Sequence, residues 1–291
     1  MVFKKTRIAP TPSGYLHLGN ALSFVLTAGL AQDHGADLLL RIDDLDRARM
    51  QPAYVQDVFD TLQFLGIPWQ EGPRDVADFE AHYSQLRRMN LYRATIETLQ
   101  EKGLLFACDC SRSRLQHTDA NRSYPGTCLH RGIPLDQAGT CLRLDTRRAA
   151  DLAMRTLSGT VHYTFPGSMH YFIVRKKDGF PAYQLSSVVD DLYFGVDLIV
   201  RGRDLLESTW AQLYLAQLLG AGSFLDTTFY HHPLLLADEG LKLSKSAGAT
   251  SLQYLRQSGH SPADIFTAIA RQSGIMPPVG DWQELYRAWR F

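Results

Sequence analysis

The sequence predicts an α/β protein whose core is a doubly wound, Rossmann-like parallel sheet. Residues 6–9 and 37–42 read as strands, and the second is almost entirely apolar, as is typical of a strand covered on both faces. Between them, over 19–34, apolar residues recur at the spacing of a helix. A strand, a helix and a strand in this order form a right-handed crossover, the building unit of such sheets.

Glycine and proline mark where the first helices begin and end. Gly35 is expected to stop the first helix, because glycine readily adopts the left-handed conformation that ends helices. Pro52 suits the first turn of a second helix, which Gly66 ends. A third helix is expected over 79–102, closed by Gly103.

The polar stretch 108–164 contains several glycines and prolines and is expected to be an irregular insertion. Beyond it we expect, in chain order, a hairpin of 171–174 and 180–184, a strand at 198–201, a helix at 205–219, a strand near 229–235, short helices after residues 250 and 262, and a final helix at 282–291. Asp204 and Glu207 fit a capping box for the helix that begins at 205. The sequence therefore predicts four parts, namely the first half of the sheet domain, the insertion, the second half and a short helical segment, at 1–107, 108–164, 165–246 and 247–291.

The 291 residues carry 30 Lys and Arg and 30 Asp and Glu, so the formal net charge is zero. A protein without excess positive charge binds nucleic acid only through local basic patches. The sequence has no apolar run long enough to span a bilayer, and its N-terminus lacks the apolar core of a signal peptide. We therefore expect a cytoplasmic protein with no membrane partner.

Two segments far apart in the chain carry the chemistry, PTPSGYLHLGN at 10–20 and KLSKS at 242–246. His17 comes just before the first helix, where free N–H groups and the helix dipole favour phosphate. Gly14 and Gly19 would let the backbone approach a ligand or adopt positive φ. Each segment alone is ordinary, a histidine near a turn or lysines on a solvated loop, but together they indicate nucleotide binding.

Cysteine spacing indicates a metal site. Three of the four cysteines, Cys108, Cys110 and Cys128, fall in one short stretch, which favours a metal over disulfides in a chain without an export signal. Tyr124 and His130 are both candidates for a fourth ligand, and chemistry alone favours the histidine. Three reduced, buried cysteines without a metal are the alternative, and Cys141 reads as an ordinary apolar residue.

The two segments resemble the "HIGH" and "KMSKS" motifs of class I aminoacyl-tRNA synthetases. RIAPTPSG at 7–14 and LRIDDLD at 40–46 narrow the resemblance to the glutamyl and glutaminyl branch, and it extends from about residue 6 to about residue 248. The resemblance implies that the chain is a ligase that activates L-glutamate with ATP and Mg²⁺ to glutamyl-adenylate.

The resemblance also implies roles for single residues. For ATP it implies His17 and Gly19 at the phosphates, with the catalytic lysines Lys242 and Lys245 stabilising charge during the attack. For glutamate it implies five contacts, which are Arg7, Thr11, Asp43, Tyr183 and Arg201. Position 43 is a departure, because glutamyl enzymes normally have Glu there; we expect that the shorter acid leaves the choice of amino acid unchanged.

Similar short enzymes hold a structural Zn²⁺ with a Cys-x-Cys, Tyr, Cys set, which implies Cys108, Cys110, Tyr124 and Cys128 as the ligands here and favours Tyr124 over His130. The segment 247–291 is too short for a separate anticodon-binding domain. The chain therefore resembles the family of glutamyl-queuosine tRNA(Asp) synthetases, which attach glutamate to the queuosine base in the anticodon of tRNA(Asp). Two alternatives stay open, a truncated synthetase that charges tRNA(Glu) and a catalytically silent module that binds RNA or an amino acid.

Overall fold

The computed structural model describes residues 1–111, 124–235, 251–276 and 278–289. The chain forms two compact units. The first unit consists of Met1–Arg87, Leu198–Arg203 and His231–Phe291, and the second of Arg88–Asp197 and Asp204–Tyr230. The four-part division drawn from the sequence stays a prediction. Among the described helices none is both long and apolar enough to cross a membrane.

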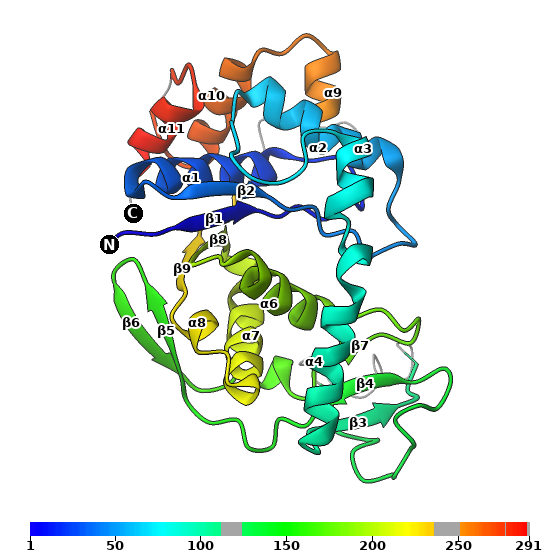
Figure 1. Ribbon diagram of the computed structural model, residues 1–291. Coiled ribbons are helices and arrows are strands. Elements are labelled where there is room, and N and C mark those ends of the chain that lie inside the picture. Colours follow the sequence, from blue (N-terminus) through cyan, green and yellow to red (C-terminus); the bar gives the residue numbers. More distant parts are fainter. Residues whose placement is uncertain (112–123, 236–250, 277, 290–291) are drawn as a thin grey trace. The chain divides into compact units, whose positions relative to one another are not determined.

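The first unit is built on parallel strands. Strand β1 (Lys5–Ile8) pairs in parallel with β2 (Asp37–Leu40) on one side and with β8 (Leu198–Gly202) on the other. Helix α1 (Leu18–His34) connects β1 to β2, so the crossover expected from the sequence is confirmed (Figure 1). Three β2 residues are fully buried, in agreement with their apolar sequence. The carboxyl ends of these three strands therefore lie at one edge of the sheet, where α/β proteins bind ligands.

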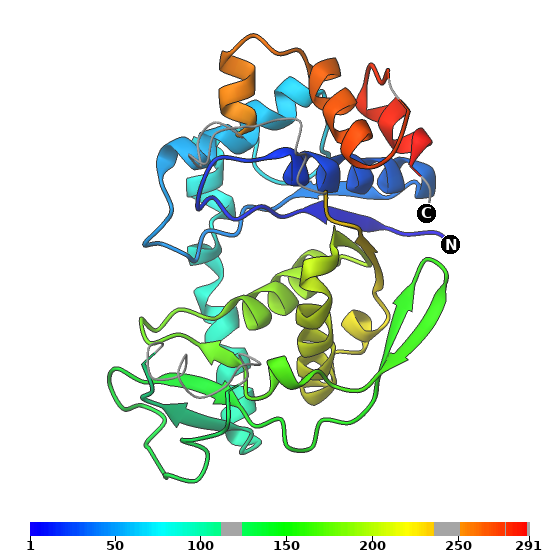
Figure 2. The ribbon, with the colours of Figure 1, turned by 180° about the vertical axis from the view of Figure 1, so that it is seen from behind.

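Helices cover α1 on the side away from the strands (Figures 1 and 2). The helices of this unit besides α1 are α2 (Pro52–Leu65), α3 (Val76–Asp78), α9 (Leu252–Gln257), α10 (Pro262–Gln272) and α11 (Trp282–Ala288). A Cβ atom on Gly29 of α1 would lie 2.1 Å from the ring of Tyr286 on α11. Only glycine therefore permits this contact between the two helices. Tyr286 also donates a hydrogen bond of 2.5 Å to Asp33.

The expected caps are confirmed and one expected helix is wrong. Gly35 and Gly66 end α1 and α2 in the left-handed conformation, both at φ 67°. The single helix expected over 79–102 is broken into α3, a π-helical turn at Phe79–Tyr83, a 3₁₀ turn at Gln85–Arg88 and α4 (Met89–Glu101). The break has a physical cause, because Ser84 leaves the helical conformation and its hydroxyl donates to the buried Asp44 at 2.6 Å.

The second unit contains helices and antiparallel strands. Its helices are α4, α6 (Tyr183–Phe194), α7 (Leu206–Leu219) and α8 (Gly222–Leu225), with 3₁₀ turns at Gly167–Met169 and Arg203–Leu205. One sheet has the antiparallel order β3 (Leu105–Cys108), β4 (Cys141–Leu144) and β7 (Ile173–Arg175). A hairpin of β5 (Leu152–Thr156) and β6 (Gly159–Tyr163) pairs in parallel with β9 (Thr228–His232), which continues into the first unit. The expectation that 108–164 is irregular is therefore wrong for its described part, which holds three strands.

Two further expectations are corrected in this unit. The second arm of the expected hairpin at 180–184 is only a single bridge between Arg175 and Pro181, and α6 begins at Tyr183. Proline donates no hydrogen bond to a strand ladder, so pairing stops there. The expected capping box is absent, because Leu205 precedes α7 without a side-chain cap and Glu207 accepts from Ser168 instead, at 2.7 Å.

Candidate functional site

His17 is the N-cap of α1. Its Nδ1 accepts the Gly19 N–H at 3.1 Å, and the Asn20 side chain accepts the His17 N–H at 3.0 Å, so the two residues form a reciprocal capping box. Because Nδ1 is an acceptor, a neutral His17 ring carries its proton on Nε2. The exposed ring thus combines an Nε2–H donor with the positive end of a 17-residue helix.

Gly19 makes room for this histidine. A Cβ atom at position 19 would lie 3.0 Å from Cε1 and 3.1 Å from Nδ1 of the His17 ring. Of the two uses expected for Gly14 and Gly19, positive φ is not found, because neither is among the glycines with positive φ; close approach to a ligand stays a prediction. The small size of Gly19, and not its conformational freedom, is what the cap requires.

One flank of the lysine segment contacts the turn that holds His17, and the other contacts helix α1, which begins at that turn. Lys242 and Lys245 themselves lie outside the described residues. After the segment, Leu252 donates its N–H to the Leu16 carbonyl at 2.7 Å, and Ser251 forms a β-bridge with His17. Before it, the ring Nε2 of His232 lies 2.7 Å from the hydroxyl of Ser23 on α1, whose hydroxyl also lies within 3.2 Å of the Gly19 carbonyl.

Arg7 and Arg201 lie on adjacent parallel strands, β1 and β8, and both side chains are buried. Thr6 pairs with Leu198, and this register, continued along both strands, places Arg201 beside Ala9. Alternate residues of a strand share a face, so Arg201 and Arg7 lie on the same face of the sheet. Two buried guanidinium groups near one edge favour a ligand with carboxylates.

Asp43 follows β2 and is held beside the turn, since its N–H donates to the Pro10 carbonyl at 2.9 Å. Its carboxylate accepts two hydrogen bonds from Arg41, at 2.7 Å from Nε and 3.0 Å from Nη2. Both side chains are buried. Arg41 therefore fixes the orientation of Asp43 and compensates part of its charge, a role that the sequence interpretation missed.

Two other expected contacts are placed as follows. Thr11 is exposed in the turn before α1, and its carbonyl accepts the Ser13 N–H at 2.9 Å. Tyr183 is the first residue of α6 and belongs to the second compact unit, with a side chain that is 38% exposed. The structure thus brings Arg7, Asp43 and Arg201 to one unit with His17.

His231 lies at the end of β9, one residue before His232. The pKa of His231 is lowered to about 3, mainly by burial and in addition by the neighbouring charges of Arg201, His232 and Arg203. The ring is therefore neutral at physiological pH. The electrostatic effect of Arg201 on His231 indicates that the cationic edge of the sheet extends to β9.

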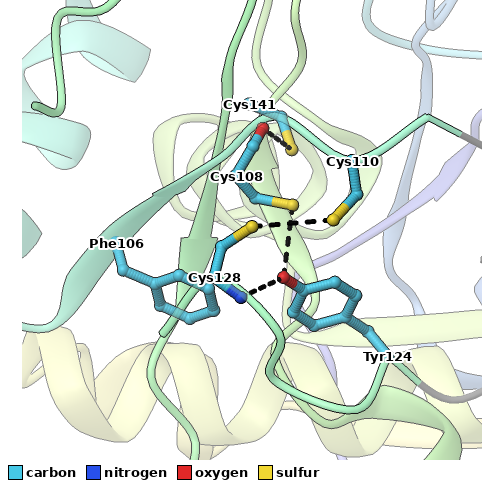
Figure 3. Packing of buried hydrophobic residues seen from close by; sticks show 6 residues of the cluster. All are labelled: Phe106, Cys108, Cys110, Tyr124, Cys128 and Cys141. Carbon is cyan, nitrogen blue, oxygen red and sulfur yellow. Dashed lines mark hydrogen bonds between the residues drawn. The ribbon is translucent and has the colours of Figure 1, made fainter. Parts of the chain in front are cut away.

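The cysteine cluster lies in the second unit and is shown in Figure 3. Cys108, Cys110 and Cys128 are buried, and their sulfur atoms all lie within 4.8 Å of one another. The Tyr124 hydroxyl points into the same group, 3.3 Å from the Cys108 sulfur, and accepts the Cys128 N–H at 2.8 Å (Figure 3). Three thiols and one oxygen around a common centre suit a tetrahedral metal ion.

Electrostatics prepare this cluster for a cation. A hydrogen bond from Cys141, against the effect of burial, lowers the pKa of Cys108 to about 3, with further hydrogen bonds from Tyr124 and Arg143. Burial and the neighbouring Cys128 raise the pKa of Cys110 to about 11. The lowered pKa of Cys108 favours its thiolate form, and metal binding would release protons from the other thiols.

His130, the rival ligand, is exposed and is not part of the group formed by the three cysteines. The geometry therefore favours Tyr124. Cys141 was expected to be an ordinary apolar residue; it is buried and its thiol lies 3.5 Å from the Cys108 carbonyl, behind the ligand set (Figure 3). Arg143 lies 3.8 Å above the centre of the Tyr124 ring, which places a positive charge beside the phenol.

Comparisons with known proteins agree with this geometry. The sequence profile described as "tRNA synthetases class I (E and Q), catalytic domain" matches residues 4–283. The chain is 37% identical over 284 residues to the glutamyl-Q tRNA(Asp) synthetase of Symbiobacterium thermophilum, covering 93% of this chain and 86% of that protein. It is 33% identical over 287 residues to the glutamate–tRNA ligase 2 of Acidithiobacillus ferrooxidans, which covers 92% of this chain and 57% of that protein.

Among solved structures, the glutamate-tRNA synthetase of Elizabethkingia anophelis superposes with a TM-score of 0.74 at 18% identity. The match covers 97% of this chain and 65% of that chain, so the chain spans less than two thirds of it. A glutamate tRNA ligase from Elizabethkingia meningosepticum in complex with its amino acid gives a TM-score of 0.73 at 18% identity, covering 99% of this chain and 64% of that one. These likenesses establish the fold.

Proposed function

Because the chain belongs to the catalytic-domain family of class I tRNA synthetases for Glu and Gln, we propose that it activates L-glutamate with ATP and transfers it to the queuosine base in the anticodon of tRNA(Asp). In the first step a carboxylate oxygen of glutamate attacks the α-phosphorus of ATP, and pyrophosphate leaves. In the second step the acceptor on the base attacks the glutamyl carbonyl, and AMP leaves. Mg²⁺ accompanies the ATP phosphates.

One observation carries the proposal for the first step. After the lysine segment, Leu252 hydrogen-bonds to Leu16 in the turn that holds His17, and before it His232 hydrogen-bonds to Ser23 in the helix that this turn opens. Segments that are more than two hundred residues apart in the sequence are thereby tied to one helix N-terminus. The proposed nucleotide contacts are His17 and Gly19, with the catalytic residues Lys242 and Lys245 acting on the α-phosphate and the leaving pyrophosphate.

For glutamate, we assign the side-chain carboxylate to Arg7 and the turn at Thr11, and a carboxylate to Arg201 as well. Asp43 faces the substrate ammonium, and Tyr183 lines the pocket. The buried positions of Arg7 and Arg201 on one face of the sheet support this assignment. Changing Asp43→Glu is expected to keep or improve glutamate use; a large loss of activity would show that Arg41 and the shorter acid form a rebuilt pocket.

The choice of acceptor rests on the relatives. The chain covers 85–86% of the first three relatives, which are named glutamyl-Q tRNA(Asp) synthetases, and 57% of a glutamate–tRNA ligase at similar identity. The deciding experiment is transfer of labelled glutamate, with ATP and Mg²⁺, to tRNA(Asp) with queuosine, tRNA(Asp) without it and tRNA(Glu). Label on the queuosine-bearing tRNA alone is the expected result. Label on tRNA(Glu) would mean a charging enzyme instead, and a chain without glutamate-dependent pyrophosphate exchange would be a silent binding module.

We assign the metal centre to Zn²⁺ held by Cys108, Cys110, Cys128 and Tyr124. The ion would hold the loop between β3 and β4 to the rest of the second unit and takes no part in the reaction. Purified protein is expected to contain about one zinc per chain. Cys110→Ser and Tyr124→Phe should lower the zinc content, whereas Cys141→Ser, a matched buried cysteine, and His130→Ala should keep it. If His130→Ala loses zinc and Tyr124→Phe retains it, His130 and not Tyr124 is the fourth ligand.

A further inference from the structure

The backbone at Leu16, directly before His17, is held from two sides. Its N–H donates to Oδ2 of Asp57 on α2 at 3.0 Å, and its carbonyl accepts from Leu252, the first residue of α9, at 2.7 Å. Leu16 is itself buried. The position of the His17 turn therefore depends on one side chain from α2 and one backbone group from α9.

The same two helices are joined by an ion pair. Arg256 of α9 extends Nη2 to within 3.4 Å of the second oxygen of Asp57, Oδ1, and 3.3 Å of the carboxylate of Asp60. Asp57 is buried, whereas the Asp60 side chain is 41% exposed. Asp57 thus contacts the turn with one oxygen, and Thr61 of its own helix and Arg256 of α9 with the other. Asp60 contacts Arg256 and its helix neighbour Gln56 but not the turn.

The buried position of Asp57 is not favourable for a carboxylate. Burial raises the pKa of Asp57 above its ordinary value, although the Leu16 N–H and the Arg256 charge both oppose this effect. A buried charge that is only partly compensated contributes little to stability. An asparagine could accept the Leu16 N–H equally well, but only a carboxylate offers acceptor oxygens to the turn and to a cation at once.

We propose that Asp57 and Arg256 are positioning residues for ATP-dependent activation, which set the His17 turn relative to the start of α9. The proposal rests on the proposed function, because it acts through His17 and through the residues that follow the lysine segment. Neither side chain touches the substrates. Their effect is to hold Leu16 and Leu252 in one geometry, on which the alignment of the two signature segments depends.

The test compares Asp57→Asn and Arg256→Gln with Arg256→Lys and with Asp60→Asn, a matched acid on the same helix. In glutamate-dependent pyrophosphate exchange, Asp57→Asn and Arg256→Gln are expected to lower kcat and raise the KM for ATP, with kcat/KM falling about ten-fold or more. The KM for glutamate and the melting temperature should stay close to the wild-type values. Arg256→Lys should recover part of the loss, and Asp60→Asn should stay within about two-fold, since an exposed partner contributes little.

Hydrogen exchange provides a readout that does not depend on activity. The amide of Leu252 should lose protection in Asp57→Asn and Arg256→Gln but not in Asp60→Asn, whereas the Leu16 amide should stay protected in Asp57→Asn, because asparagine still accepts it. Unchanged kinetics of pyrophosphate exchange in Asp57→Asn would overturn the proposal. Equal rises in the KM for ATP and the KM for glutamate, together with a lower melting temperature, would also overturn it. A wild-type chain that shows no glutamate-dependent exchange would instead contradict the proposed function, and the amide protection would still decide whether the pair holds the turn.

Discussion

Asp190 in the second unit and Asp57 in the first are both buried carboxylates paired with an arginine, and they differ in how completely they are paired. Asp190 accepts two hydrogen bonds from Arg88, at 2.8 and 3.3 Å, and one from the Tyr92 hydroxyl at 2.6 Å. Asp57 has one backbone donor at 3.0 Å and two more distant partners, the Thr61 hydroxyl at 3.5 Å and Arg256 at 3.4 Å. Full compensation is what a structural ion pair requires, whereas partial compensation indicates a group retained for its geometry.

The two arginines, Arg88 and Arg256, also differ in how deeply they are buried. The Arg88 side chain is 6% exposed and lies over the ring of Phe194, 5.0 Å from its centre, while the Arg256 side chain is 22% exposed. Burial alone would lower the pKa of Arg88, but the hydrogen bonds and charge of Asp190 raise it above its ordinary value. The ion pair of the second unit is therefore buried in its core, whereas the ion pair of the first unit lies at the surface of the helices and is partly exposed to solvent.

The two ion pairs should differ most in the free energy of unfolding that is lost when the arginine is removed. Arg88→Met leaves the charge of Asp190 buried and is expected to lower the free energy of unfolding by about 3–5 kcal/mol. Arg256→Met should cost about 1 kcal/mol or less, because the Arg256 side chain is itself 22% exposed and lies 3.4 Å from the buried Asp57 and 3.3 Å from the 41% exposed Asp60. Urea unfolding of the two variants measures both values, and equal losses would remove the distinction between the two pairs.

His231 gives the first unit a pH dependence of its own. Its pKa is about 3 in the folded chain and 6.5 ordinarily, so the folded state binds fewer protons between these values. The stability that it contributes is present above pH 6.5 and is lost as the pH falls towards 3, by about 1 kcal/mol per pH unit. Melting curves of wild type and His231→Gln between pH 7 and pH 5 should diverge, with the variant less sensitive to acid. Parallel curves would show that another group is responsible.

A smaller effect is expected at the third partner of Asp190. Tyr92→Phe removes one hydrogen bond and leaves the Arg88 pair intact, which should cost about 1–2 kcal/mol. The variant keeps the fully buried ring, so packing is unchanged. A loss as large as that of Arg88→Met would mean that the tyrosine and the arginine act as one inseparable network.

The smallest effect on stability is predicted for Asp57→Asn. The raised pKa of Asp57 means that its favourable contribution is present below its ordinary value of 3.8 and is lost as the pH rises through the folded-state pKa. At pH 7 the charge therefore gives no net stabilisation, and the variant should unfold within about 0.5 kcal/mol of the wild type. Urea unfolding at pH 7 and pH 4.5 checks this, and a large loss at pH 7 would identify Asp57 as a structural acid like Asp190.

The sequence predicted those parts of the fold that depend on local pattern. The crossover of β1, α1 and β2 and the two glycine caps follow from apolar spacing and from the conformational freedom of glycine. The break at Ser84 could not be predicted, because its cause is Asp44, forty residues away in the chain. Helix α6 was missed because its N-terminal turn follows the Pro181 bridge and resembles a strand end.

The candidate site shows the same limit. His17 was predicted from its place before a helix, and Arg7 and Arg201 from the family resemblance; the structure places all three in the first unit, and their roles stay predictions. Arg41 and Asp57 could not, since their roles arise from pairing with Asp43 and with a backbone N–H rather than from spacing. Side chains that position other residues have no signature in a single sequence, because any acid or base of suitable length in the right place suffices.

The close contact between Gly29 and Tyr286 has a consequence for biosynthesis. Helix α1 leaves the ribosome well before its partner α11, because the two helices are far apart in the sequence. The second unit, by contrast, is complete once residue 230 has emerged. We therefore expect the second unit to fold first. Helix α1 keeps the apolar side that packs against α11 exposed until α11 has been synthesised, and during that time a chaperone could bind it.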